Sequence, residues 1–378
     1  MTEKEAYIAF NLVEGFGAVK VAALAAQCGG SVADAYALLP ADQRRDWRGN
    51  DPDWRSEIAR AARMHVAIIT PADPEYPPRL RDLASPPLAL YVFGSVAALA
   101  APSVAIVGTR RLTAYGADVA DRFAAGLAQA GWSIISGLAL GADTAAHRGA
   151  LAVGGVTVGV LGGALDEFFP SENRTLGRQM AAARGAVVTE FPFGRKPDKT
   201  TFPQRNRIVA ALASGVLAVE CPRKSGTLIT CGFAADLGRT VLAVPGRVDS
   251  PSSAGCNALI RDGARLVASV DDVLEELAPL ARPSSARKAP PAVRVQAAAP
   301  TPSPAAPARP KRAPAAPEVT LTPEEALVMR NLGDSPMALD NLVRSTGLPA
   351  ARLNTIVVQL RIKRQVRLHP GNRVGRYA

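Results

Sequence analysis

The chain is 378 residues long, 48% hydrophobic and 20% charged, so it can bury a sizeable core and should fold as two or three domains. It has no apolar run long enough to span a membrane and no signal-peptide pattern, so we expect a cytoplasmic protein without a membrane segment. Its four scattered cysteines and three separated histidines argue against a disulfide framework, a zinc site or another metal centre, and we expect no cofactor.

The positive charge is concentrated towards the C-terminus. Residues 282–378 hold 16 Lys and Arg against 5 Asp and Glu. The difference of 11 positive charges equals the net charge of the whole chain, +11. Residues 1–281 are balanced at 28 against 28. A basic tail is typical of nucleic-acid binding, although an anionic membrane surface or simple solubility would also explain it.

Residues 1–70 predict a small helical domain. Its helical patterns flank the turn EGFGAVK, and a Gly-x-Gly between two helices is typical of a helix-hairpin-helix or sterile-alpha-motif-like unit. The backbone amides of such a turn can contact phosphates, but a helical domain used only for packing fits equally well. The segment that follows contains too many prolines to form a regular helix or strand, and it leads into the main domain.

Residues 71–281 predict an extended Rossmann-like α/β domain. Short apolar runs rich in β-branched residues alternate with helical patterns, which indicates βα units in a parallel sheet covered on both faces. Ligands of such sheets bind beyond the carboxyl ends of the strands, so the loops after the strands form the candidate site. The predicted strands are 104–108, 133–136, 156–161, 186–190, 216–220 and 240–245.

Residues 282–318 are built largely of Ala and Pro and predict a basic linker without a core. Residues 319–378 predict a winged helix-turn-helix domain, with two helices around STGLP and then a strand and a basic ending. The second, recognition helix is expected from about residue 350 to 361. Such a domain can bind duplex DNA or dock a protein, and the acidic residues all precede that helix, which favours DNA.

Glycines and arginines follow the first strand of the main domain. Gly108 allows close backbone approach, and Arg110 and Arg111 can project from the edge of the sheet. The loop does not match the dinucleotide fingerprint GxGxxG. Phosphate contact and surface solvation explain these arginines equally well.

The loop after the second strand is SGLALGADTAAH. Gly137 and Gly141 predict a tight turn whose free amides open a helix and can hold an anion. Asp143 and His147 are one helical turn apart, so an acid–base or metal pair is one hypothesis. A histidine held for packing is the commoner arrangement, and no third metal ligand is evident.

A helix begins within the segment KTTFPQRNRIV, which brings Lys199 and Phe202 beside Arg205 and Arg207. The two arginines are two positions apart and cannot share a helix face. We therefore expect one of them to contact nucleic acid and the other to brace the fold or a carboxylate such as Glu190.

The loop after the fifth strand is ECPRKSGTLIT. Lys224, Ser225 and Gly226 precede a helix, so its amides and a hydroxyl can hold a phosphate. The P-loop pattern is not met, and ATP hydrolysis is not supported. All of these segments should lie at one edge of the sheet. Cations and glycine turns around one aromatic ring, without a nucleophile and its base, favour a single strand of nucleic acid bound without base specificity.

Seven blocks in order resemble the bacterial DNA-processing protein A family (DprA, also called Smf). They run from about residue 75 to 280 as VAIVGTRR, SGLALGADTAAH, VLGGALDEFFPSEN, FPQRNRIVAAL, KSGTLIT, VPG and NALIRDGA. The resemblance implies DNA contacts from Arg110, Lys199 and the stacking ring of Phe202. Further contacts are implied for Arg205, Arg207 and the turn Lys224-Ser225-Gly226. Leu140 stands where the family has arginine, and Phe168-Phe169 replaces an aliphatic–tyrosine pair.

The resemblance also implies a function. Proteins of this family bind and protect single-stranded DNA in natural transformation and competence, help to load the RecA recombinase, and act as homodimers through the Rossmann-like domain, without enzymatic activity. Two alternatives remain open. A nucleoside-monophosphate phosphoribohydrolase would need a glutamate where Thr230 stands, and a transcription factor would prefer particular duplex sequences.

Overall fold

The computed structural model describes residues 1–281 and, further along the chain, residues 322–332, 337–349, 352, 353, 356, 357, 360, 365–369 and 373–376. The chain forms two compact units, Met1–Pro291 and Ala292–Ala378. The predicted linker 282–318 lies outside the described residues, as does part of the predicted recognition helix. No helix among the described residues is both long enough and apolar enough to span a membrane.

The first unit begins with helices that pack around Phe10. A capping box at Thr2 and Glu5 starts the first helix, and Phe10 packs edge-on against Tyr36 with ring centroids 5.1 Å apart. The helices are α1 (Glu3–Leu12), α2 (Ala18–Gln27), α3 (Val32–Leu38), the short η1 (Ala41–Gln43) and α4 (Trp54–Arg63). The segment predicted to be helical also contains a strand, β1 (Val66–Ile69), which pairs with β2 of the main sheet.

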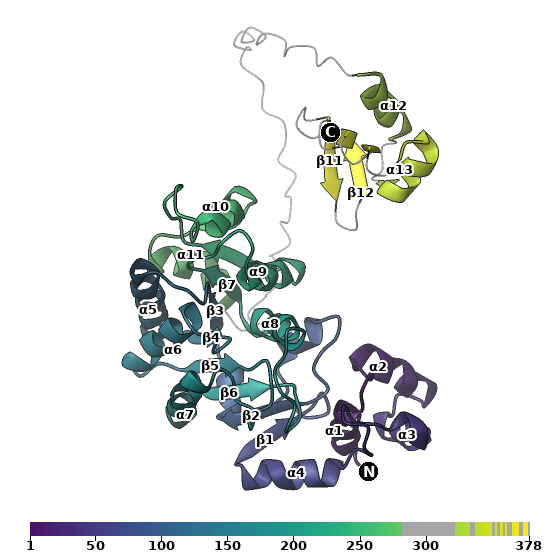
Figure 1. The fold of residues 1–378 in the computed structure, drawn as a ribbon, viewed down its shortest axis with the longest axis vertical. Helices are drawn as coiled ribbons and strands as arrows, with labels where there is room; N and C mark the ends of the chain where they lie inside the picture. The colour runs from purple at the N-terminus through teal and green to yellow at the C-terminus, as the bar shows by residue number, and fades with distance from the viewer. Residues whose placement is uncertain are drawn as a thin grey trace, which may run out of the picture. The chain divides into compact units, whose positions relative to one another are not determined.

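A nine-stranded sheet in the order β1-β2-β6-β5-β4-β3-β7-β8-β9 forms the centre of this unit (Figure 1). The pairs β1–β2 and β2–β6 are antiparallel and the others are parallel. The predicted α/β class with a parallel sheet is therefore confirmed. The remaining strands are β2 (Leu90–Gly94), β3 (Ser103–Val107), β4 (Ser133–Ser136), β5 (Thr157–Val160), β6 (Ala186–Thr189), β7 (Gly215–Ala218), β8 (Thr240–Ala243) and β9 (Arg265–Leu266).

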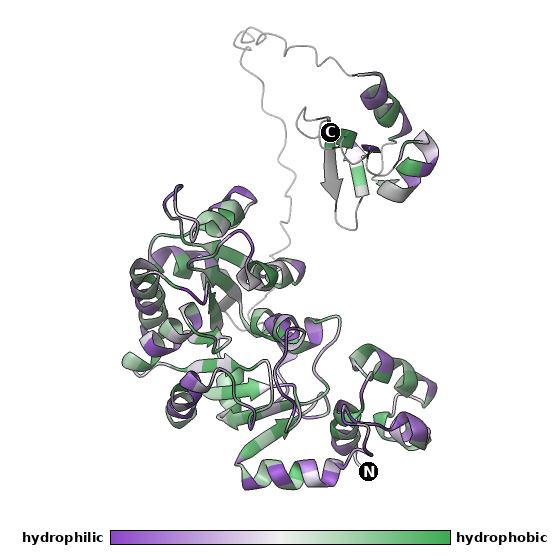
Figure 2. Cartoon of the chain, viewed as in Figure 1, coloured by the Kyte–Doolittle hydropathy of each residue, from purple (hydrophilic) through white to green (hydrophobic). Residues whose placement is uncertain are grey.

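Helices cover both faces of the sheet, as its fully buried central strands β3 to β7 require. On one face Phe123 of α5 and Leu277 of α11 belong to a core cluster with residues of β3, β4, β7 and β8, and on the other Val209 of α8 and Cys231 of α9 pack against neighbouring strand positions. Figure 2 shows hydrophobic residues concentrated on the strands. The helices are α5 (Ala114–Gln129), α6 (Ala142–Ala152), α7 (Arg174–Ala182), α8 (Thr201–Leu212), α9 (Gly226–Asp236), α10 (Ala254–Arg261) and α11 (Val270–Ala281), with short η2 (Pro78–Asp82), η3 (Val96–Leu99) and η4 (Ser171–Asn173).

The second unit has its own small core, in which Val328 and Leu342 pack with Ile356, Leu360 and Val374. Its strands form a sheet in the order β10-β12-β11. A capping box at Thr322 starts its first helix. The elements are α12 (Pro323–Asn331), β10 (Met337–Ala338), α13 (Leu339–Thr346), β11 (Val366–His369) and β12 (Arg373–Arg376).

Candidate nucleic-acid interface

A cleft of about 340 Å³ lies at the carboxyl ends of the central strands. It is lined by the loops after β3, β4 and β7 and by the first two turns of α8. β3 lies between β4 and β7, so the chain continues to one side of β3 and later returns on the other. The loops that follow such a switch point diverge and leave a crevice, which is where open α/β sheets bind ligands.

The floor of the cleft is formed by closely packed backbone. A Cβ atom on Gly108 would lie 2.5 Å from the Cβ of Ala142 and 3.1 Å from the carbonyl oxygen of Glu220, so a side chain there would force the loops apart. The Glu220 carboxylate accepts hydrogen bonds from the amide and hydroxyl of Thr113, at 3.0 and 2.8 Å, and from Ser252 at 3.1 Å. Glu220 therefore holds the loops together.

The side chains of Arg110 and Phe202, which both line the cleft, are in contact with each other. The guanidinium carbon of Arg110 lies 5.1 Å from the centroid of the Phe202 ring, within the range of a cation–π contact. Arg110 is exposed and Phe202 is half-buried, because its ring packs over Gly162, where a Cβ would lie 2.8 Å from a ring carbon. An exposed cation thus lies over a partly exposed ring at the cleft.

The turn before α9 forms another part of the wall of the cleft. The Ser225 hydroxyl caps the helix by accepting the Thr227 amide at 3.2 Å, and Lys224 and Gly226 are exposed. The Asn206 side chain donates to the Gly226 carbonyl at 3.3 Å and so ties α8 to this turn.

Lys199 is exposed on the loop before α8 and is not among the residues that line the cleft. The loop is held by Asp198, which accepts the amides of Thr200 and Thr201 at 2.7 and 3.0 Å. Hydrogen bonds from Thr200 and these amides lower the pKa of Asp198 to about 2. The carboxylate is therefore ionised at neutral pH and holds the backbone of the loop that carries Lys199.

The two arginines of α8 both have internal partners, although the sequence predicts that one of them contacts nucleic acid. Arg205 is only 5% exposed and donates hydrogen bonds to the carbonyls of Gly137 and Val160. Burial lowers its pKa to about 10, so it stays charged at neutral pH. Arg207 forms an ion pair with Glu190, in which both side chains are about five-sixths buried. Both arginines brace α8 against the sheet.

The loop after β4 also differs from expectation. The Asp143 carboxylate accepts the amides of Gly137 and Ala139 at 3.0 and 3.2 Å. An internal carboxylate thus occupies the nest that the sequence predicted for an external anion. A side chain at Gly137 would overlap the Arg205 guanidinium, so this glycine makes room for the buried arginine.

Asp143 and His147 do not form an acid–base pair. His147 is completely buried, and its Nδ1 lies 2.7 Å from the hydroxyl of Thr157. That hydroxyl donates to the Ile134 carbonyl at 2.7 Å, so it accepts from Nδ1–H and the proton-free Nε2 has no partner. Burial lowers the pKa of His147 to about 3, so the ring is neutral and serves packing.

We expect His147 to make the protein less stable in mild acid. The unfolded chain binds a proton at this histidine below about pH 6.5, whereas the folded chain does not do so until about pH 3. The free energy of unfolding should therefore fall between pH 7 and pH 5, by about 2 kcal/mol from this group. Urea titrations at both pH values, with His147→Gln alongside, measure this loss, and an equal loss in both proteins would contradict the expectation.

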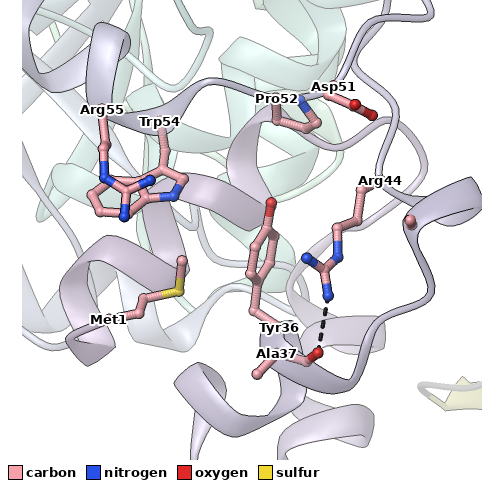
Figure 3. Close-up of a pocket in the computed structure, with 9 residues that line it drawn as sticks. Met1, Tyr36, Ala37, Arg44, Asp51, Pro52, Trp54 and Arg55 are labelled. Carbon is pink, nitrogen blue, oxygen red and sulfur yellow. Dashed lines mark hydrogen bonds between the residues drawn. The ribbon is translucent and has the colours of Figure 1, made fainter.

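A second cleft, of about 440 Å³, lies among the N-terminal helices (Figure 3). Its Arg55 guanidinium lies 4.4 Å from the centroid of the Trp54 ring, and that of Arg44 lies 5.0 Å from the Tyr36 ring. Arg44 also donates to the Ala37 carbonyl at 2.9 Å. Tyr36 is only 6% exposed because it packs against Phe10, and the carboxylate of Asp51 lines the same cleft. This cleft is therefore a weaker candidate for binding a strand of nucleic acid than the cleft at the strand ends.

The sequence did not single out Asn206 or Ile229, which also line the main cleft. Asn206 is four residues after Phe202, so helical periodicity places both on one face. Ile229 is 44% exposed on α9, one turn after the Ser225 cap, which is an unusual place for a large apolar side chain. The first signal could have been found in the sequence, whereas the second could not, because the sequence of α9 has apolar residues on all sides.

The fold and the cleft define an α/β protein with a Rossmann-like sheet and a small C-terminal unit. The model of the family described as DNA recombination-mediator protein A matches residues 67–278, and the model described as DprA winged helix domain matches residues 296–372. The chain therefore belongs to the DNA-processing protein A (DprA/Smf) family. The expected winged helix domain at the C-terminus is confirmed by the second match.

Individual relatives agree with this assignment. Protein Smf of Synechocystis is 36% identical over 320 residues, which cover 82% of this chain and 80% of that relative. The putative DNA processing protein DprA of Mycobacterium tuberculosis is 42% identical over 241 residues, or 58% of this chain and 62% of that relative.

Two solved structures are similar to the chain as well. The X-ray structure of Streptococcus pneumoniae DprA has a TM-score of 0.63 and 33% identity, and the match covers 73% of this chain and 98% of that one. A Helicobacter pylori DprA structure, described for its single-stranded DNA binding mode, has a TM-score of 0.52 and 29% identity, covering 57% of this chain and 97% of that one.

Proposed function

We propose that the chain binds single-stranded DNA without sequence specificity at the strand-end cleft. The contact between Arg110 and Phe202 is the observation that carries this proposal. An aromatic face at the mouth of a cleft can stack an unpaired base, and every base offers such a face, so the contact tolerates any sequence. Arg110, Lys199 and Lys224 are exposed cations that can follow the phosphates of the same strand.

The cleft is less suited to hydrolysis of a nucleotide. Thr230 is 3% exposed and donates to the Gly226 carbonyl at 3.4 Å, where a phosphoribohydrolase would need a carboxylate. Asp143, which also lines the cleft, is occupied by two backbone amides. We therefore propose a binding protein rather than an enzyme.

Membership of the family supports three further proposals. Bound strands are protected during DNA processing, including natural transformation, and are passed to a RecA-type recombinase. The protein acts as a homodimer through its Rossmann-like unit. The winged helix unit binds duplex DNA or a protein. Arg352, which belongs to the predicted recognition helix of this unit, forms an ion pair with Glu324 of α12 at 2.6 Å.

We expect the protein to bind a single-stranded oligonucleotide more tightly than the duplex of the same sequence. Three phosphate contacts predict that the logarithm of the association constant falls with the logarithm of salt concentration with a slope of about −2. Fluorescence anisotropy titrations at several salt concentrations measure both quantities. Equal or tighter binding of the duplex, or release of free base from nucleoside monophosphates, would contradict the proposal.

A further inference from the structure

A small apolar pocket adjoins the main cleft. It has a volume of about 70 Å³ and shares Arg110 and Phe202 with the cleft. Its other side is formed by Leu140 and Phe169, which are 42% and 50% exposed. Phe202 therefore separates two adjoining hollows, and Lys224 lines only the larger one.

We propose that Leu140 and Phe169 form a second binding site, called the second seat below, for an unpaired base of the same DNA strand. The seat is continuous with the cleft, because Arg110 and Phe202 line both hollows. Large apolar side chains that are exposed next to a binding cleft commonly mark part of the binding surface. This inference rests on the proposed function, since the occupant is the strand held by the main cleft.

The geometry of the two rings indicates two bases rather than one. The centroids of Phe169 and Phe202 are 6.0 Å apart and their planes are inclined by 50°. Two rings in this arrangement touch each other and cannot both lie flat against a single base. Each ring can therefore carry its own base, and the backbone between the two bases would pass Arg110.

The chemistry of the seat points to a base and not to a phosphate. Leu140 and Phe169 are uncharged, and the cations that line this hollow are Arg110, which is shared with the cleft, and the internally bonded Arg205. A contact of this kind should add affinity that is independent of salt, whereas each phosphate contact adds about 0.7 to the salt slope.

We expect Phe169→Ala to weaken binding of an oligothymidylate by at least about fivefold and to leave the salt slope unchanged. Phe169→Leu should show a similar loss because it keeps apolar packing but lacks a ring face, and Phe169→Tyr should bind like the unchanged protein. Leu140→Arg places a cation beside the strand and should steepen the slope by about 0.7. Leu38→Ala, at an exposed position on α3, is the matched control.

Anisotropy titrations of the full chain, with thermal melting of each variant, separate the outcomes. If the unchanged protein binds the oligonucleotide but Phe169→Ala and Phe169→Leu bind equally well, the second seat is wrong and the proposed function stands. A loss in Phe169→Ala that Phe169→Leu restores would assign packing to this side chain and also overturn the seat, as would an unchanged slope in Leu140→Arg. Failure of the unchanged protein to bind would overturn the proposed function itself.

Discussion

Replacing Phe202 by alanine is expected to weaken binding of single-stranded DNA by about fivefold to a hundredfold. Loss of one base–aromatic stacking contact costs about 1–3 kcal/mol of binding free energy, which corresponds to this range. The Arg110 guanidinium would also lose the ring that lies 5.1 Å away and would become less ordered. The effect should be similar for oligonucleotides of different sequence, because stacking tolerates every base.

Two variants separate stacking from support of the fold. Phe202→Tyr keeps the ring and should bind like the unchanged protein, whereas Phe202→Leu keeps part of the packing over Gly162 but should bind weakly. Anisotropy titrations measure affinity, and thermal melting shows whether each variant is folded. Unchanged affinity in a folded Phe202→Ala protein would rule out the stacking role.

Replacing Arg205 by alanine is expected to lower the free energy of unfolding by about 3–5 kcal/mol. The buried guanidinium donates to the carbonyls of Gly137 and Val160, and its removal would leave these acceptors unpaired and a cavity beside them. The charge of Arg205 also opposes the rise that burial causes in the pKa of Asp143. A loss of this size is a large fraction of the usual stability of a domain.

Urea denaturation of Arg205→Ala and Arg205→Lys measures this loss. The lysine variant keeps a charge but cannot reach both carbonyls with one planar group, so it should recover only part of the stability. If instead Arg205 contacts the DNA strand directly, as the family resemblance implied, the alanine variant would keep its stability and lose affinity. The two roles therefore predict opposite results.

The central sheet could be predicted because its strands are buried on both faces and read as apolar runs. The predicted strand 133–136 coincides with β4, while the run 216–220 extends two residues beyond β7. Val219 is buried without belonging to the strand, so apolar character reports burial rather than strand pairing. The edge strand β9 was missed because its two residues are both exposed and one is an arginine.

The site could be predicted only in part. The rule that ligands bind at strand ends locates Arg110 and Lys224 on loops that line one cleft. It cannot tell which cations of α8 are free, because the partners of Arg205 are backbone carbonyls 68 and 45 residues away, which have no signature in side-chain patterns. The occupied nest at Gly137 has a different, local cause, since the carboxylate of Asp143, six residues further on, competes with any external anion.

The hydrogen bonds of Asp198 have a consequence for the thermodynamics of association. They fix the Lys199 loop and the first turn of α8 before DNA binds, although the N-cap residue of that helix makes no side-chain hydrogen bond. The backbone under Phe202 therefore has little freedom left to lose when a complex forms. Preorganisation of this kind favours affinity through entropy, at a residue that itself stays outside the cleft.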